Sequence, residues 1–160
     1  MRLIVSAAAV AALSLAACGK KDEERRPGVA PAPGGFSVTG QDGATATVST
    51  SAAAATAALP AFAPLYPGGA IEGSVAGVSR SDAEASGGTA TFTTPDPPQK
   101  VIAFYKARTQ AAGLKTEGEV NMGAALMLVA RDDATDRGLQ VMASNQAGKT
   151  SVTLFWATPK

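Results

Sequence analysis

The sequence predicts an α+β fold in which one amphipathic helix packs on a small antiparallel sheet, preceded by a signal peptide and a flexible linker. Three observations lead to this prediction. An apolar N-terminal segment ends at the only cysteine, a stretch rich in Ala, Gly and Pro follows, and periodic hydrophobic patterns begin near residue 59. The expected units are therefore 1–17, 18–58 and 59–160, and the last is long enough to bury one modest core.

The composition excludes several kinds of chemistry. The 160 residues include no histidine and one cysteine, and the formal net charge is +1. Without histidine there is neither a Ser-His-Asp triad nor an imidazole metal ligand, and a single thiol forms no internal disulfide or thiolate cluster. A near-neutral chain gives no electrostatic reason to expect nucleic acid. We expect no cofactor, no metal site and no enzymatic activity.

The first residues have the pattern of a secretory signal. Arg2 supplies a positive charge, and residues 3–17 are uncharged and mostly apolar. This segment has about 15 residues, whereas a helix that spans a bilayer needs roughly 20. Its length is typical of the apolar region of a signal peptide.

The end of this segment resembles the lipobox of bacterial lipoproteins. Leu15, Ala16, Ala17 and Cys18 match that pattern position by position. The resemblance implies cleavage between Ala17 and Cys18, a diacylglycerol thioether on Cys18, and an acyl chain such as palmitate on its new amine. Several acyl chains would anchor the protein stably to a membrane. A signal peptide cut elsewhere and an uncleaved short anchor are the alternatives.

The residues after Cys18 predict a location and a tether. Gly19 and Lys20 differ from the aspartate associated with inner-membrane retention, which favours the outer membrane and a periplasm-facing domain. The rest of 18–58 has too little large apolar surface to offset its ordering entropy. Within it, 36–50 is a candidate β-hairpin that must dock on something to persist, and 52–59 is helix-prone but too short to be stable alone. Fully stretched, such a tether would reach on the order of 140 Å.

The C-terminal domain begins with turns and strands. Gly68-Gly69 and Gly87-Gly88 are expected to form turns. We predict a strand over 70–79, a polar loop over 80–88 and a short threonine-rich strand over 89–94.

One helix follows. Asp96 precedes two prolines, and its carboxylate is expected to accept a hydrogen bond from the Gln99 amide, as in a capping box. The helix is predicted to run to about Ala112, with Gly113 as a left-handed C-terminal cap.

The helix has one apolar face. Val101, Tyr105 and Ala112 share it, flanked by Ile102 and Phe104. Arg108 falls near this stripe, and we expect its stem to be buried and its head to reach solvent. Arg108 is also the weak candidate for a ligand-binding residue.

Four strands complete the predicted sheet: 124–130 is a continuous apolar run and is expected to be central, and alternation with period two predicts the last two. They cover 114–122, 124–130, 139–144 and 152–157, and turns are expected over 132–138 and 146–149. The order β-β-α-β-β-β-β predicts an antiparallel sheet with one helix across one face.

Several short motifs resemble a domain of uncharacterised bacterial envelope lipoproteins, over roughly 36–115. The motifs run Leu65-Tyr66-Pro67-Gly68-Gly69, Thr93-Thr94-Pro95-Asp96, Phe104-Tyr105-Lys106 and Gly113-Leu114. Thr109 stands where that domain usually has leucine, and Leu114 where it usually has tryptophan. The resemblance implies structural roles and no activity.

Candidate chemistry is sparse. Asp132, Asp133 and Asp136 could hold a cation, but the EF-hand spacing is absent and an acidic hairpin turn is favoured. Glu117 and Glu119 alternate along a strand, so we expect both on the solvated face rather than in an acid/base pair.

Two functional hypotheses remain. The first is a non-enzymatic envelope module, held at the membrane by lipidated Cys18, whose uncovered sheet face or edge contacts an envelope protein or the cell wall. The second is a small-ligand-binding or hydrolytic envelope protein that uses Asp, Glu, Ser or Arg108, and it requires a pocket with convergent polar groups.

Overall fold

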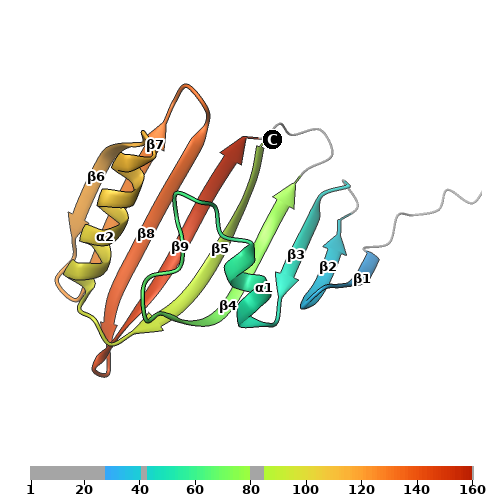
Figure 1. Ribbon diagram of the computed structural model, residues 1–160, viewed down its shortest axis with the longest axis horizontal. Helices are drawn as coiled ribbons and strands as arrows, with labels where there is room; N and C mark the ends of the chain where they lie inside the picture. Colours follow the sequence, from blue (N-terminus) through green and yellow to red (C-terminus); the bar gives the residue numbers. More distant parts are fainter. Residues whose placement is uncertain (1–27, 41–42, 80–84, 160) are drawn as a thin grey trace, which may run out of the picture.

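The computed structural model describes residues 28–40, 43–79 and 85–159. These residues form one antiparallel sheet in the order β1-β2-β3-β4-β5-β9-β8-β7-β6, with two helices (Figure 1). The fold is α+β as predicted, but the sheet dominates it. The strands are β1 (Gly28–Ala32), β2 (Gly35–Thr39), β3 (Thr45–Ser49), β4 (Ala70–Ser79), β5 (Ala85–Thr94), β6 (Lys115–Asn121), β7 (Ala125–Asp132), β8 (Arg137–Gln146) and β9 (Lys149–Pro159), and the helices are α1 (Ala52–Ala57) and α2 (Pro98–Ala111).

The segment expected to be a tether is part of the sheet. The candidate hairpin over 36–50 is confirmed: β2 pairs with β3, with Phe36 opposite Val48. β3 also pairs with β4, which provides the docking that an isolated hairpin lacks. The expectation of a flexible linker is therefore wrong for residues 28–40 and 43–58. The signal segment 1–17, Cys18 and the stretch up to residue 27 lie outside the described residues.

β5 is longer than predicted. It begins at Ala85, and Gly87 and Gly88 pair with Ala157 and Trp156 of β9 instead of forming a turn. A Cβ on Gly87 would lie 2.7 Å from the Trp156 carbonyl oxygen, so glycine is needed for this close approach. Long-range pairing with β9 outweighs the local turn signal.

α2 begins differently from the prediction and ends as predicted. Its N-cap is Pro97, without a side-chain cap hydrogen bond, so the expected bond from the Gln99 amide to Asp96 is absent. Asp96 instead accepts from the Tyr66 hydroxyl at 2.8 Å and from Lys100 Nζ at 3.1 Å. At the other end Gly113 adopts a φ of +84°, the left-handed conformation of a C-terminal cap.

The main core lies between α2 and the sheet. Val101, Ile102 and Tyr105 are buried there, as the helical pattern predicted. Thr109 and Leu114, which depart from the usual motif, are buried too. The Thr109 hydroxyl donates to the Tyr105 carbonyl oxygen at 2.9 Å, so a polar side chain is satisfied inside the core.

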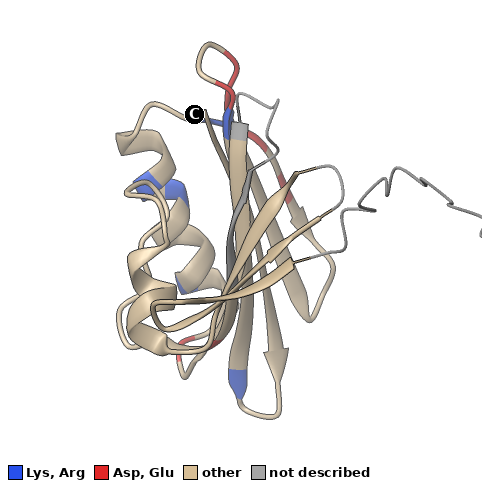
Figure 2. Ribbon diagram, turned by 90° about the vertical axis from the view of Figure 1, so that its right-hand side faces the viewer, with Lys and Arg blue, Asp and Glu red and all other residues tan. Residues whose placement is uncertain are grey.

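The two faces of the sheet differ. Both helices lie on one face, and in the described part of the chain no helix lies over the other (Figure 2). We call the second the open face. No helix among the described residues is long and apolar enough to cross a membrane.

Candidate ligand-binding groove

A groove of about 680 Å³ lies between α1 and the helix-covered face of the sheet. Its walls combine small apolar side chains from the N-terminal segment with hydroxyl-bearing side chains and one tryptophan from the strands. The lining residues are Pro33, Thr47, Ser49, Ala54, Ala57, Ala58, Pro60, Ser86, Gly87, Trp156 and Thr158.

α1 forms one wall, and its sequence explains both its stability and its small size. The Ser51 hydroxyl accepts from the Ala54 amide at 3.2 Å, and the Thr56 hydroxyl donates to the Ala52 carbonyl oxygen at 2.8 Å. The Thr50 amide donates to the Gly34 carbonyl oxygen at 2.8 Å, so the turn between β1 and β2 holds the start of the helix. Alanine side chains do not reach across to the sheet, which leaves the space open.

The strands form the floor. Trp156 of β9 presents a large aromatic side chain that is 8% exposed. Gly87 on β5 adds no side chain, and the Ser86 and Thr158 hydroxyls lie 2.8 Å apart beside it. Because an indole ring offers apolar area and hydroxyls offer directional hydrogen bonds, this floor can both bury and orient a ligand.

The charge of the lining indicates the kind of ligand. The groove is lined by apolar groups and by the hydroxyls of Thr47, Ser49, Ser86 and Thr158, and among the described residues that line it none is Asp, Glu, Lys or Arg. A charged ligand would lose its hydration without gaining an ionic partner. Burying an unpaired charge costs on the order of several kcal/mol. The lining therefore favours a neutral, mostly apolar molecule.

A cluster of aromatic and charged side chains fixes the segment behind the groove. The Tyr66 ring lies 5.1 Å from the Phe104 ring in an edge-on arrangement, and the Tyr66 hydroxyl donates to Asp96. The Tyr105 hydroxyl donates to the Pro64 carbonyl oxygen at 2.9 Å. Three of the motifs that resemble the envelope lipoprotein domain, those containing Tyr66, Asp96 and Phe104-Tyr105, thus meet at one place, where they hold the segment around Pro64 and Tyr66 against α2.

The charge states in this cluster follow from its contacts. Hydrogen bonds from Tyr66 and then from Lys100 lower the pKa of Asp96, and burial, followed by the bond to Asp96, raises the pKa of Tyr66. Burial also raises the pKa of Tyr105. At neutral pH the Asp96 carboxylate is ionised and both phenols keep their protons.

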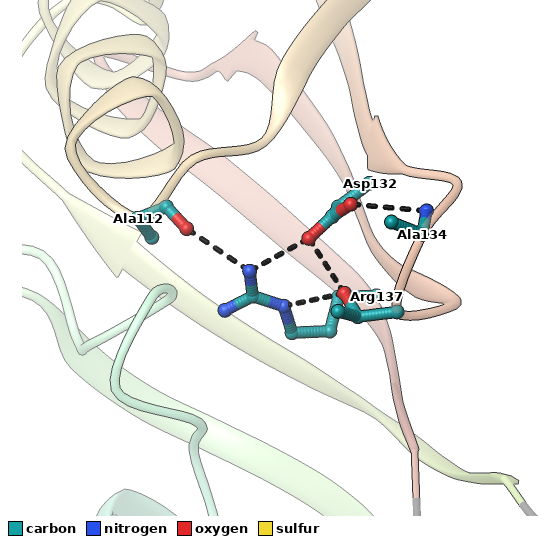
Figure 3. Close-up of polar contacts among 5 residues, drawn as sticks. Ala112, Asp132, Ala134 and Arg137 are labelled. Carbon is teal, nitrogen blue, oxygen red and sulfur yellow. Dashed lines mark hydrogen bonds and ion pairs between the residues drawn. The ribbon is translucent and has the colours of Figure 1, made fainter.

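The acidic turn predicted over 132–138 joins β7 to β8. Asp132 Oδ2 accepts from Arg137 at 2.8 Å and from Thr135 Oγ1 at 2.6 Å, and Oδ1 accepts from the Ala134 amide. The Arg137 guanidinium also donates to the Ala112 carbonyl oxygen at the end of α2, as Figure 3 shows. Both Asp132 oxygens have partners within the protein, so this side chain ties a hairpin to a helix.

The other predicted candidates lie away from the groove. Arg108 is exposed, and its guanidinium carbon sits 5.2 Å from the centre of the Phe104 ring, a cation–π contact. A β-bulge between Thr116 and Gly118 interrupts the alternation assumed for the two glutamates. Both glutamates are exposed, as expected, but Glu119 lies on the helix-covered face, where its carboxylate pairs with Lys106 of α2 at 2.8 Å.

The groove was not predicted from the sequence. Only Trp156, which shares one face of β9 with buried Leu154, could have indicated the floor. The opposite wall comes from the alanines of 52–58, whose composition had suggested a tether.

The fold and the groove together define a helix-on-sheet protein with an open groove between α1 and the sheet. Residues 75–159, more than half of the chain, match the START domain-like family, and the chain belongs to that family. No curated protein matches the chain, and no solved structure matches it.

Proposed function

We propose that this protein binds a small, neutral, mostly apolar molecule in the groove between α1 and β9, without catalysing a reaction. The observation that carries the proposal is a groove of about 680 Å³ lined by alanines, hydroxyls and Trp156. Its volume falls within the roughly 300–1,000 Å³ of sites for small organic ligands. Membership of the START domain-like family supports binding of a small ligand over the envelope interaction module that the sequence favoured.

Fluorescence of Trp156 tests this proposal, because it is the only tryptophan in the chain. The neutral apolar dye Nile red serves as the probe. Saturable binding should quench Trp156 by energy transfer to the dye. Ala57→Leu fills the groove and should weaken dye binding about tenfold, the equivalent of about 1.4 kcal/mol.

Ala53→Leu is the matched control, since Ala53 lies on the same helix and does not line the groove. It should bind the dye as the parent protein does. Dye binding that does not saturate, or that both substitutions weaken equally, would show that the groove is not the site.

We further propose that the protein is a bacterial envelope lipoprotein anchored through Cys18 and facing the periplasm, with the outer membrane favoured over the inner. Support comes from the lipobox residues Leu15 to Cys18. Intact-mass measurement of the protein from a membrane fraction should give a chain that starts at Cys18 and carries acyl groups. Cys18→Ser should abolish the added mass, whereas an unmodified Cys18 in the parent protein would contradict the anchor.

A further inference from the structure

The exposed large apolar side chains lie on one face of the sheet. In the described part of the chain they are Val29, Phe36, Val120, Met122, Met142 and Phe155. Side chains alternate between the faces of a strand, so Met142 and Phe155 point away from their buried neighbours Val141 and Leu154. The strand register places Val29, Phe36 and Val120 on the same face, and Met122 directly follows the end of β6.

These side chains are concentrated over β6 to β9. Val120 lies opposite Met127, and Met127 opposite Met142, so three apolar side chains form one row across three strands. Val129 and Phe155 flank Gln140 in the next row. Neighbours in such rows are about 5 Å apart, which makes the patch continuous.

The adjacent part of the open face shows what a solvated face looks like in this protein. On β5 the corresponding positions are Thr89, Thr91 and Thr93, all half-buried and polar. These threonines separate the apolar side chains over β6 to β9 from Val29 and Phe36 on β1 and β2. The apolar side chains over β6 to β9 are contiguous, and contiguous exposed apolar patches mark interaction surfaces.

A pair of basic side chains borders the patch. Lys115 of β6 lies directly opposite Arg131 of β7, and both are exposed. Like charges in directly opposed positions are destabilising. The ion pairs among residues 28–40, 43–79 and 85–159 include neither of them. A shallow depression of about 250 Å³ separates Arg131 from Phe155, so cations and apolar groups share one surface.

The length of chain before the sheet limits where this surface can go. β1 begins at Gly28, so about ten residues separate it from Cys18, and they span at most about 35 Å. The 140 Å expected of a long tether is thus much reduced. This step rests on the proposed anchoring: a chain lipidated at Cys18 keeps the domain beside the bilayer.

We propose that the open face over β6 to β9 docks on an anionic lipid bilayer. Met142, Phe155 and Val120 enter the boundary between headgroups and acyl chains, and Lys115 and Arg131 bind headgroup phosphates. The phosphates supply the anionic partner that the basic pair lacks among the described residues. A second copy of the chain would present the same two cations. The groove lies on the opposite face of the sheet and stays accessible.

Vesicle sedimentation tests this surface with the anchor removed. The protein is residues 18–160 with Cys18→Ser, and the vesicles contain phosphatidylethanolamine with or without phosphatidylglycerol. Binding should require phosphatidylglycerol and weaken with salt. Phe155→Ser should reduce it about tenfold, and Lys115→Gln and Arg131→Gln about fivefold each. Arg108→Gln, which removes an exposed arginine from α2, should have no effect.

Three outcomes overturn the proposal. Absence of vesicle binding does so, as does an equal loss in Arg108→Gln and Arg131→Gln. Light scattering that gives a dimer, which Phe155→Ser converts to a monomer, would assign the surface to a second copy. None of these outcomes bears on Nile red binding or on the mass of the Cys18 adduct, so failure of the docking surface is distinguishable from failure of the proposed function.

Discussion

The family-matching region 75–159 and the N-terminal segment 28–74 share one sheet but contribute very different cores. All the largest fully buried side chains lie between Phe92 and Leu154. In β1, β2, β3 and α1 the buried residues are Ser49 and Ala55. The N-terminal strands are held in the sheet mainly by backbone hydrogen bonds. In the family region, packing of large buried side chains adds to the same backbone pairing.

This difference explains why there is a groove at all. Where large side chains fill the space between helix and sheet, as under α2, the layers touch. Where the small side chains of Ala54, Ala57 and Ser49 line the space between α1 and the sheet, room is left for a groove. A composition that cannot build a core can thus still form a groove, provided that a neighbouring core holds the strands in place.

The largest effect on the free energy of unfolding is expected from a pair of phenylalanine substitutions, one in each region. Phe92 on β5 is fully buried and Phe36 on β2 is 37% exposed. Phe92→Ala should lower the free energy of unfolding by about 3–5 kcal/mol. Phe36→Ala should lower it by about 1 kcal/mol or less. Denaturant unfolding measures both, and similar losses would remove the contrast between the two regions.

Substitution of one glycine in each region tests how closely the backbones of neighbouring strands pack. A Cβ on Gly87 would meet the Trp156 carbonyl oxygen, and one on Gly35 would meet the Val48 carbonyl oxygen. Gly87→Ala should cost about 1–3 kcal/mol of global stability, because β5 and β9 lie at the centre of the sheet. Gly35→Ala should instead raise amide exchange in β1 to β3 and leave β8 and β9 protected. Loss of protection throughout the sheet in Gly35→Ala would contradict this.

Much of the C-terminal architecture was predictable because its signals are local. Alternation located β8 and β9, a continuous apolar run located β7, and the helical period located the buried face of α2. Three features depended on contacts between distant residues and were missed. Gly87 and Gly88 have the composition of a turn, but they pair with β9. Asp96 has the sequence position of a helix cap, but its carboxylate accepts a hydrogen bond from Tyr66. The alanines of α1 have the composition of a linker, but they form a helix that packs against β4.

The candidate site was less predictable than the fold. Its lining combines Thr47, Ser86 and Trp156, which are far apart in the sequence and carry no motif. Arg108, the weak candidate for a ligand-binding residue, is not among the residues that line the groove and contacts Phe104. Hydroxyls and alanines are too common in sequences to indicate a site until the topology brings them together.

A smaller effect is expected where residues 58–69 are held against α2. Tyr66→Phe removes the hydroxyl that donates to Asp96 at 2.8 Å while keeping the ring against Phe104. It should cost about 1 kcal/mol, typical of one hydrogen bond. Because Ala58 and Pro60 line the groove, dye affinity should fall with stability. A loss of stability with unchanged dye binding would show that the contacts of Tyr66 do not hold the groove wall in place.

The smallest effect concerns acid, to which the two regions should respond differently. Within 28–40 and 43–74 the only charged residue is Glu72, whereas the three ion pairs of the described residues lie between Asp96 and Arg137. Hydrogen bonds from Thr135 and Arg137 lower the pKa of Asp132 to about 2. Since the unfolded chain has the higher pKa, it binds more protons in this window, and stability falls as pH drops from about 4 to about 2.

Asp132→Asn should flatten that part of the pH profile, measured as the denaturant midpoint at each pH. Thr135→Val removes the contact that lowers the Asp132 pKa most, so it should move the loss of stability to higher pH. Protection of α2 near Ala112 should fall in the same pH range, because protonated Asp132 no longer holds the Arg137 guanidinium on that carbonyl oxygen. A profile unchanged by Asp132→Asn would mean that the acid sensitivity of the family region comes from another carboxylate, with Asp96 and Glu119 as the remaining members of its ion pairs.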